Sequence, residues 1–267
     1  MWVTCSQICK LITPSSIIQT PVAPMTTFKV RGLVLREYEA GESDKRLSIL
    51  CKGRGRLMIY ARGARKAKSK FLAASQILTY GDYIIADGRN FLSMAQAEVI
   101  ENFYPIRQDY DLLYYAQYVL EVCEKTIPDR TPSDDLLLLA IKTLQHISKQ
   151  KIIPYQSIQV FLFRFFLFYG LAPEMECCAL CGTPAASGGQ SDGMFCDEGI
   201  VCGRCLHHKT NMPLSIPAQE ALRHILSTDL NHSFMFQAKE AVLNELAKAA
   251  RLCWLGHFPI TLQTEIH

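Results

Sequence analysis

The chain has 267 residues, of which 49% are hydrophobic and 20% are charged, and its formal net charge is +3. This length suits one large or two modest domains with enough apolar material for a core, which excludes a disordered chain. No stretch reaches the roughly 20 uncharged apolar residues that a membrane span needs. The sequence therefore predicts a globular protein that does not cross a membrane.

Residues 1–24 differ in composition from the rest of the chain. They contain Thr, Ser, Gln and three Pro, with one charge at Lys10 and no long apolar region of the kind found in a signal peptide. Met25 directly precedes the first clear strand pattern. We interpret residues 1–24 as a disordered leader or as the product of a misassigned start codon.

Residues 25–104 are predicted to form a β domain. Apolar and polar residues alternate in several short runs, and turn residues such as Gly53-Arg54-Gly55 and Asp87-Gly88 separate them. The strands expected from this pattern lie near 28–36, 46–51, 56–61, 76–80, 83–86 and 91–100. Five or six short strands predict a small closed barrel, either of the oligonucleotide-binding (OB) type or SH3-like, and the pattern alone does not separate the two.

From Asp109 onward the spacing of apolar residues becomes helical. We expect Thr131 to cap a second helix, with Pro132 at its first position. The expected helices lie near 110–122, 132–147, 154–169, 215–227 and 237–254. The run Phe161–Tyr169 is apolar on nearly every side, which indicates a central core helix. The fold class is therefore α+β, with a helical bundle in two parts, 105–176 and 211–260, on either side of a module at 177–210.

Cysteines dominate that module. Six of the eleven cysteines lie between residues 177 and 205, and two C-x-x-C pairs are separated by 20 residues. An odd cysteine count without a secretory signal indicates a reducing compartment, here the cytoplasm, and favours metal ligation over disulfides. We expect one structural Zn²⁺, because four sulfur ligands leave no open position for a substrate. The expected ligands are Cys178, Cys181, Cys202 and Cys205.

The sequence alone leaves other interpretations of these cysteines open. The cysteines could be unligated thiols, or the site could have lost its metal. Three further residues lie near enough to replace a ligand: Cys177, Cys196 and His207.

Basic residues concentrate near the N-terminus. Between Lys45 and Gly81 there are ten Lys or Arg residues and no Asp or Glu, which indicates a polyanionic partner more directly than the net charge does. The candidate DNA-contacting residues are Lys52, Arg54, Arg56, Arg62, Arg65, Lys66, Lys68 and Lys70. Nearby aromatic residues could stack on unpaired bases, although each is expected in the core first: Tyr60, Phe71, Tyr80 and Tyr83. The competing interpretation is a solvated basic loop.

The sequence shows no catalytic constellation. His207 and His208 lack a nearby nucleophile, and Gly53-Arg54-Gly55 is too short for a phosphate-binding loop. We therefore do not expect an enzyme. The alternatives are a zinc-ribbon enzyme that processes RNA or DNA, and a pure protein adaptor.

Three motifs resemble the bacterial RecO family, the recombination mediators of the RecF pathway. They are the glycine and basic run from Lys52 to Ser69, the segment Phe168-Tyr-Gly-Leu-Ala-Pro173, and the two C-x-x-C pairs. The resemblance covers residues 28–255. Residues 1–24 and the additional Cys177 and Cys196 depart from the family pattern.

The resemblance implies a function in DNA repair and homologous recombination. It implies an OB domain, a helical bundle and a zinc-ribbon-like element, and binding of single- and double-stranded DNA without sequence specificity. It further implies annealing of complementary strands and loading of RecA on DNA covered by single-strand-binding protein. The expected partners are RecR and the acidic C-terminal tail of single-strand-binding protein, and the expected location is the cytoplasm, with the nucleoid. Some members of the family lack the cysteines, so the resemblance implies that the zinc has a structural and not a chemical role.

Overall fold

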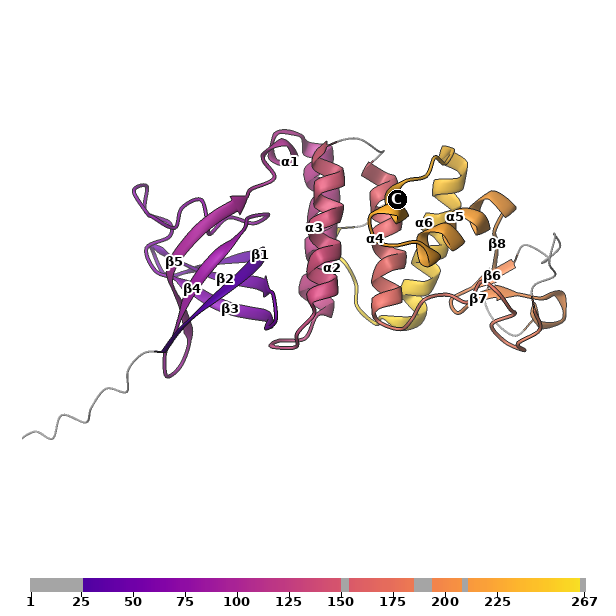
Figure 1. The fold of residues 1–267 in the computed structure, drawn as a ribbon, viewed down its shortest axis with the longest axis horizontal. Coiled ribbons are helices and arrows are strands. Elements are labelled where there is room, and N and C mark those ends of the chain that lie inside the picture. Colours follow the sequence, from indigo (N-terminus) through magenta and orange to yellow (C-terminus); the bar gives the residue numbers. More distant parts are fainter. Residues whose placement is uncertain (1–25, 150–153, 185–193, 208–210, 265–267) are drawn as a thin grey trace, which may run out of the picture.

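A β-barrel precedes a helical domain in this protein (Figure 1). The computed structural model describes residues 26–149, 154–184, 194–207 and 211–264. The prediction for residues 1–24 lies outside these ranges. Within them, no helix has both the length and the apolar character needed to cross a membrane.

The barrel contains five strands: β1 (Thr26–Ala40), β2 (Asp44–Cys51), β3 (Gly55–Ala61), β4 (Tyr80–Asp87) and β5 (Leu92–Glu101). Their order around the barrel is β1-β2-β3-β5-β4, and β1 also pairs with β4, which closes the barrel. β3 and β5 run parallel and the other neighbours are antiparallel. This order is that of an OB fold, so the structure decides against the SH3-like alternative.

Side-chain alternation explains how the barrel fills its interior. On β3, Leu57, Ile59 and Ala61 are buried, while the residues between them are half-buried on the outer face. The strand expected at 56–61 is therefore confirmed, but Tyr60, which was expected in the core first, lies on the outer face.

The strand expected at 76–80 is wrong apart from its last residue, Tyr80, which begins β4. Residues 71–79 form turns instead. Leu78 has a φ of 62°, and its backbone N donates to Val34 O on β1 at 3.1 Å, while Val34 N donates to Thr79 O at 2.9 Å. The left-handed conformation of Leu78 interrupts the extended backbone, although Leu78 itself is buried.

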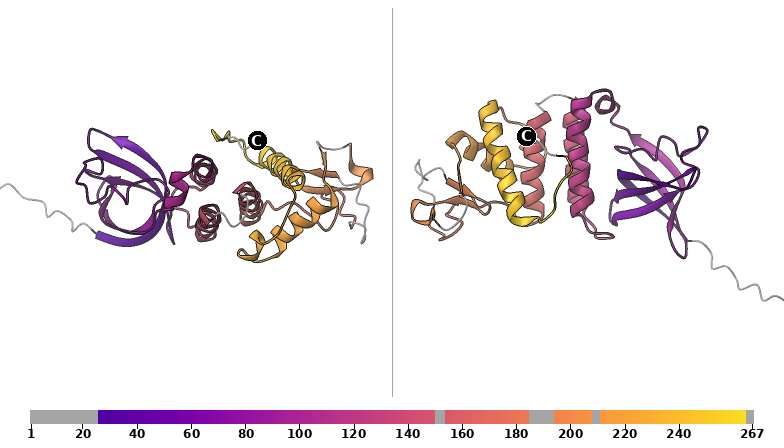
Figure 2. Two further views of the ribbon diagram at one scale, coloured as in Figure 1. Left: turned by 90° about the horizontal axis from the view of Figure 1, so that it is seen from above. Right: turned by 180° about the vertical axis from the view of Figure 1, so that it is seen from behind.

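Six helices follow in the described residues: α1 (Tyr104–Gln108), α2 (Tyr110–Thr126), α3 (Asp134–Lys149), α4 (Pro154–Phe168), α5 (Ile216–Ser227) and α6 (Glu240–His257). Two short 3₁₀ turns are η1 (Gly203–Cys205) and η2 (His232–Phe234). Figure 2 shows α4 between the α2/α3 pair and α6. Phe161, Phe163, Phe165 and Phe166 are fully buried, which confirms α4 as the central core helix.

The predicted start of the second long helix is wrong. α3 begins at Asp134, two residues after Pro132, and Thr131 lies outside the helix. The reason is tertiary, because the connection between α2 and α3 is tied to the barrel. Arg130 N donates to Arg56 O at 2.9 Å, and Arg130 adopts a φ of 58°.

That connection holds the barrel against the helices. The Asp134 carboxylate accepts from Gly53 N at 2.6 Å. The Arg56 guanidinium pairs with Glu124 at 3.1 Å and Asp129 at 2.8 Å, and it donates to Ile127 O. The β2–β3 turn is therefore anchored on α2, α3 and the loop between them.

Candidate metal centre and basic surface

The cysteine module forms a small sheet beyond α4. Its strands are β6 (Met194–Cys196), β7 (Gly199–Val201) and β8 (Met212–Pro213), in the order β7-β6-β8. Gly199 has a φ of 137°, and a Cβ there would lie 2.2 Å from Glu174 O, so this position requires glycine. The hairpin β6–β7 is thereby held close to the segment that follows α4 and leads into the first cysteine pair.

Four cysteines converge at one point in the module. The sulfur atoms of Cys178, Cys181, Cys202 and Cys205 all lie within 4.8 Å of one another. A tetrahedral zinc with bonds of about 2.3 Å places its sulfur ligands about 3.8 Å apart. The Cys181 and Cys202 sulfurs are 3.6 Å apart, so the arrangement fits a metal ion held by four sulfurs.

Polar groups around Cys178 and Cys181 favour the thiolate form, whereas the hydrogen bond with Cys181 raises the pKa of Cys205 to about 12. Cys202 N donates to the Cys178 sulfur at 3.4 Å. The Thr183 hydroxyl lies 3.3 Å from the Cys181 sulfur, and this hydrogen bond is the leading reason why the pKa of Cys181 falls to about 6. Arg204 in turn donates to Thr183 Oγ1 at 2.9 Å. Because a thiolate is the form that binds metal, these contacts prepare the site for a cation.

The alternative ligands are not part of the converging set. Among the described residues, the metal-ligand grouping consists of the four predicted cysteines and does not include Cys177, Cys196 or His207. Cys196 is fully buried beside Cys178 and Val201 in a small apolar cluster. The four cysteines that the C-x-x-C spacing predicted are therefore the ones whose sulfurs converge.

The basic segment, residues 62–70, lies on the barrel surface between β3 and β4. Its five cations are exposed: Arg62, Arg65, Lys66, Lys68 and Lys70. Lys66 and Lys68 have no acid within salt-bridge distance among the described residues, whereas Arg65 pairs with Glu39 at 3.0 Å. Lys70 donates to Ala95 O on β5. Lys52 and Arg54, in the β2–β3 turn, are also exposed.

Arg56 differs from the other seven candidates. Its side chain is 19% exposed, and its guanidinium is occupied by Glu124, Asp129 and Ile127 O. These contacts join the barrel to the helical domain. The structure thus gives Arg56 a structural role, and its predicted contact with DNA stays a prediction.

The aromatic candidates divide by burial. Phe71 and Tyr83 belong to the barrel core, with 5% and 0% exposure. Tyr60 is half-buried on the outer face, and its ring lies 4.9 Å from that of Phe91, which is 40% exposed. The sequence placed Phe91 only at the start of the strand expected near 91–100, and the structure places it in the loop directly before β5.

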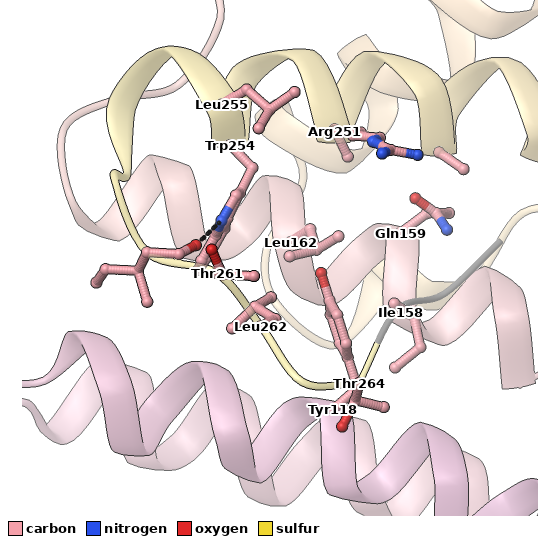
Figure 3. A pocket seen from close by; sticks show the side chains of 13 residues that line it. Tyr118, Ile158, Gln159, Leu162, Arg251, Trp254, Leu255, Thr261, Leu262 and Thr264 are labelled. Atoms are coloured by element: carbon pink, nitrogen blue, oxygen red, sulfur yellow. Dashed lines mark hydrogen bonds between the residues drawn. The ribbon is translucent and has the colours of Figure 1, made fainter.

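A pocket of about 170 Å³ lies in the helical domain, between α2, α4, α6 and the C-terminal segment (Figure 3). Tyr118, Leu162, Trp254 and Leu262 form its apolar walls. Gln159 and Arg251 are its polar members along α4 and α6. The sequence did not predict this pocket, because its wall is assembled from four separate segments.

An OB barrel with an exposed basic segment, joined to a helical domain that carries a four-cysteine cluster, defines a class of nucleic-acid-associated proteins. Family models agree with this description: "Recombination protein O N terminal" matches residues 25–103 and "Recombination protein O C terminal" matches residues 107–263. The chain belongs to the RecO family, whose function is DNA repair and recombination.

Curated relatives support this membership. The DNA repair protein RecO of Acetivibrio thermocellus is 31% identical over 228 residues, which cover 85% of this chain and 90% of the relative. The protein of the same name from Listeria welshimeri is 34% identical over 177 residues, covering 66% and 68%. That of Bacillus pumilus is 29% identical over 223 residues, covering 82% and 84%.

Proposed function

We propose that this protein binds single- and double-stranded DNA without sequence specificity and anneals complementary strands. The observation that carries the proposal is the row of exposed cations on an OB barrel, of which Lys66 and Lys68 have no acidic partner among the described residues. Cations on a surface of this kind neutralise phosphates and do not distinguish bases. Two strands held on one basic surface repel each other less, so they can pair without hydrolysis of a nucleotide.

Annealing of labelled complementary oligonucleotides tests this surface. Replacing Arg62, Arg65, Lys66 and Lys68 together by Ala should slow annealing strongly. Affinity should also fall less steeply with salt. The negative slope of log affinity against log salt should become shallower by about 0.7 for each phosphate of a single strand that the protein no longer neutralises. The matched control replaces four exposed cations of the helical domain by Ala: Lys149, Lys239, Lys248 and Arg251. Equal annealing by the two variants would rule out the basic segment as the DNA surface.

The metal in this proposal is one structural Zn²⁺ held by the four cysteines. Zinc accepts four sulfur ligands in a tetrahedron, and such a site leaves no position for a water or a substrate. We accordingly propose that the protein is not an enzyme. A magnesium-dependent nuclease assay on single-stranded DNA and RNA tests this, since cleavage would support the alternative of a zinc-ribbon enzyme.

The proposed partners follow from the family and from charge. They are RecR, single-strand-binding protein through its acidic C-terminal tail, and RecA functionally, in the cytoplasm at the nucleoid. An acidic tail requires cations, and these are available on the basic segment and at Arg251 beside the pocket of Figure 3. Competition between the tail peptide and a DNA oligonucleotide separates the two surfaces, because only a tail bound at the basic segment displaces DNA.

A further inference from the structure

An aromatic and guanidinium row crosses the outer face of the barrel. Tyr38 on β1 lies opposite Arg46 on β2, Arg46 lies opposite Tyr60 on β3, and Tyr60 lies opposite Ser93 on β5. Directly opposed residues of neighbouring strands present their side chains on the same face. Tyr60 is flanked by the buried Ile59 and Ala61, so this face is the outer one.

The side chains of the row contact one another. The Arg46 guanidinium lies 5.4 Å from the centre of the Tyr38 ring. The rings of Tyr60 and Phe91 are 4.9 Å apart, and the Arg62 guanidinium lies 5.5 Å from the Phe91 ring. We call Tyr38, Arg46, Tyr60, Phe91 and Arg62 the stacking row. It ends at Arg62, the first cation of the basic segment.

The position of the row matches the ligand face of the fold. In OB folds, oligonucleotides bind across β2 and β3, between the β1–β2 loop and the β4–β5 loop. Phe91 is the last residue of the β4–β5 loop and exposes 40% of its surface. On the other side, Arg65 donates to Gly41 O in the β1–β2 loop, so the basic segment borders the same face.

We propose that Tyr60 and Phe91 form a stacking site for unpaired nucleobases, with Arg46 and Arg62 beside it for the phosphates of the same strand. This inference rests on the proposed function and adds to it a preference for single-stranded over double-stranded DNA. Aromatic rings stack on any exposed base, whereas the bases of a duplex are already stacked on each other and cannot lie on the rings. The row therefore favours single strands, while the lysines of the basic segment serve single strands and duplexes alike.

Three DNA probes separate the rings from the charges: an oligo-dT strand, an abasic strand of the same length, and a duplex of the same length. Replacing Tyr60 and Phe91 by Ala should weaken binding of oligo-dT by about 5- to 150-fold for each base that no longer stacks. Binding of the abasic strand and the duplex should stay unchanged. The matched control replaces Tyr104 and Tyr110, which are 59% and 84% exposed outside the row, by Ala and should bind all three probes like the unaltered protein.

A second variant keeps an aromatic ring and so keeps the fold. In Phe91→Trp, oligo-dT should quench the introduced indole fluorescence and the abasic strand should not, whereas Tyr110→Trp should respond to neither. Unchanged oligo-dT affinity in the Ala variant, equal losses for all three probes, or absent quenching in Phe91→Trp would each overturn the stacking site. If the unaltered protein binds none of the probes, the proposed function itself fails.

Discussion

Gly55 lies at a close approach between the barrel and the connection from α2 to α3. Its φ is +67°, and a Cβ there would lie 2.0 Å from Thr131 O in the α2–α3 connection. Gly53, two residues earlier, has a φ of +70° but no atom within 4 Å of a Cβ position. The two glycines share the same backbone requirement and differ only in their surroundings.

These two glycines give a matched pair of substitutions. Gly53→Ala should cost about 1–2 kcal/mol of unfolding free energy, the cost of a left-handed residue with a side chain. Gly55→Ala should cost more, because the added methyl also collides with the Thr131 backbone. Urea unfolding of both variants measures the difference. Equal losses would mean that the barrel does not depend on this close approach.

Glu121 fastens the C-terminal segment to α2. Its carboxylate accepts from Gln263 N at 2.6 Å and from Thr264 N at 2.9 Å, and it pairs with Lys125 at 2.7 Å. Burial raises the pKa of Glu121, but these hydrogen bonds outweigh burial and leave the pKa below its ordinary value. A carboxyl whose pKa is lowered by folding stabilises the folded state at pH values above its pKa in the unfolded chain, about 4.3. This stabilisation is lost as the pH falls through the lower pKa of the folded state.

The Glu121→Gln variant tests this pH dependence. The variant should be less stable than the unaltered protein at neutral pH, and the gap should close as the pH falls below about 4. Thermal unfolding at several pH values measures it. A gap that stays constant down to about pH 3 would show that the charge of Glu121 does not hold the segment.

Single residues also show where prediction from the sequence ends. The C-x-x-C spacing identified the four converging cysteines, because short knuckles fix ligand geometry locally. The basic run did not reveal that Arg56 faces the helical domain, since its acidic partners lie about seventy residues further along the chain. The sequence did not predict the contact between the rings of Phe91 and Tyr60, because the two residues are about thirty positions apart in the chain.

At the scale of elements, the β2–β3 hairpin and α4 followed from local pattern alone. The hairpin has two glycines at its turn, and the second half of α4 is a largely apolar run, interrupted by Arg164, that ends before Gly170. The start of α3 and the segment before β4 did not follow, because contacts with distant residues determine both. Arg130 is bonded to β3 and Leu78 to β1.

The metal module should depend on its ion for its own folding. Strands β6, β7 and β8 contain three, three and two residues, and the apolar cluster around Cys178, Cys196 and Val201 is small. Elemental analysis should find one zinc per chain, lost in Cys181→Ser and retained in Cys177→Ser. Chelation should open residues 177–207 to protease while DNA binding by the barrel persists. A chain that carries no zinc, or that loses DNA binding on chelation, would contradict this division.

At the scale of the whole molecule, the basic surface and the metal module lie at opposite ends. Figure 1 shows the barrel at the left and strands β6–β8 at the right, with the helices between them. Of the eight candidate DNA-contacting cations, Arg56 joins the barrel to α2. The remaining seven belong to the barrel. From this separation we propose that the cysteine cluster supports the helical domain and that DNA binds at the barrel.

Hydrogen–deuterium exchange of the full chain, with and without a saturating oligo-dT strand, tests this assignment most directly. Binding should slow exchange in β2, β3, the basic segment and the β4–β5 loop at 88–91. Exchange in β6–β8 and α5 should stay the same. Protection confined to the helical domain or the metal module, with the barrel unchanged, would contradict the account.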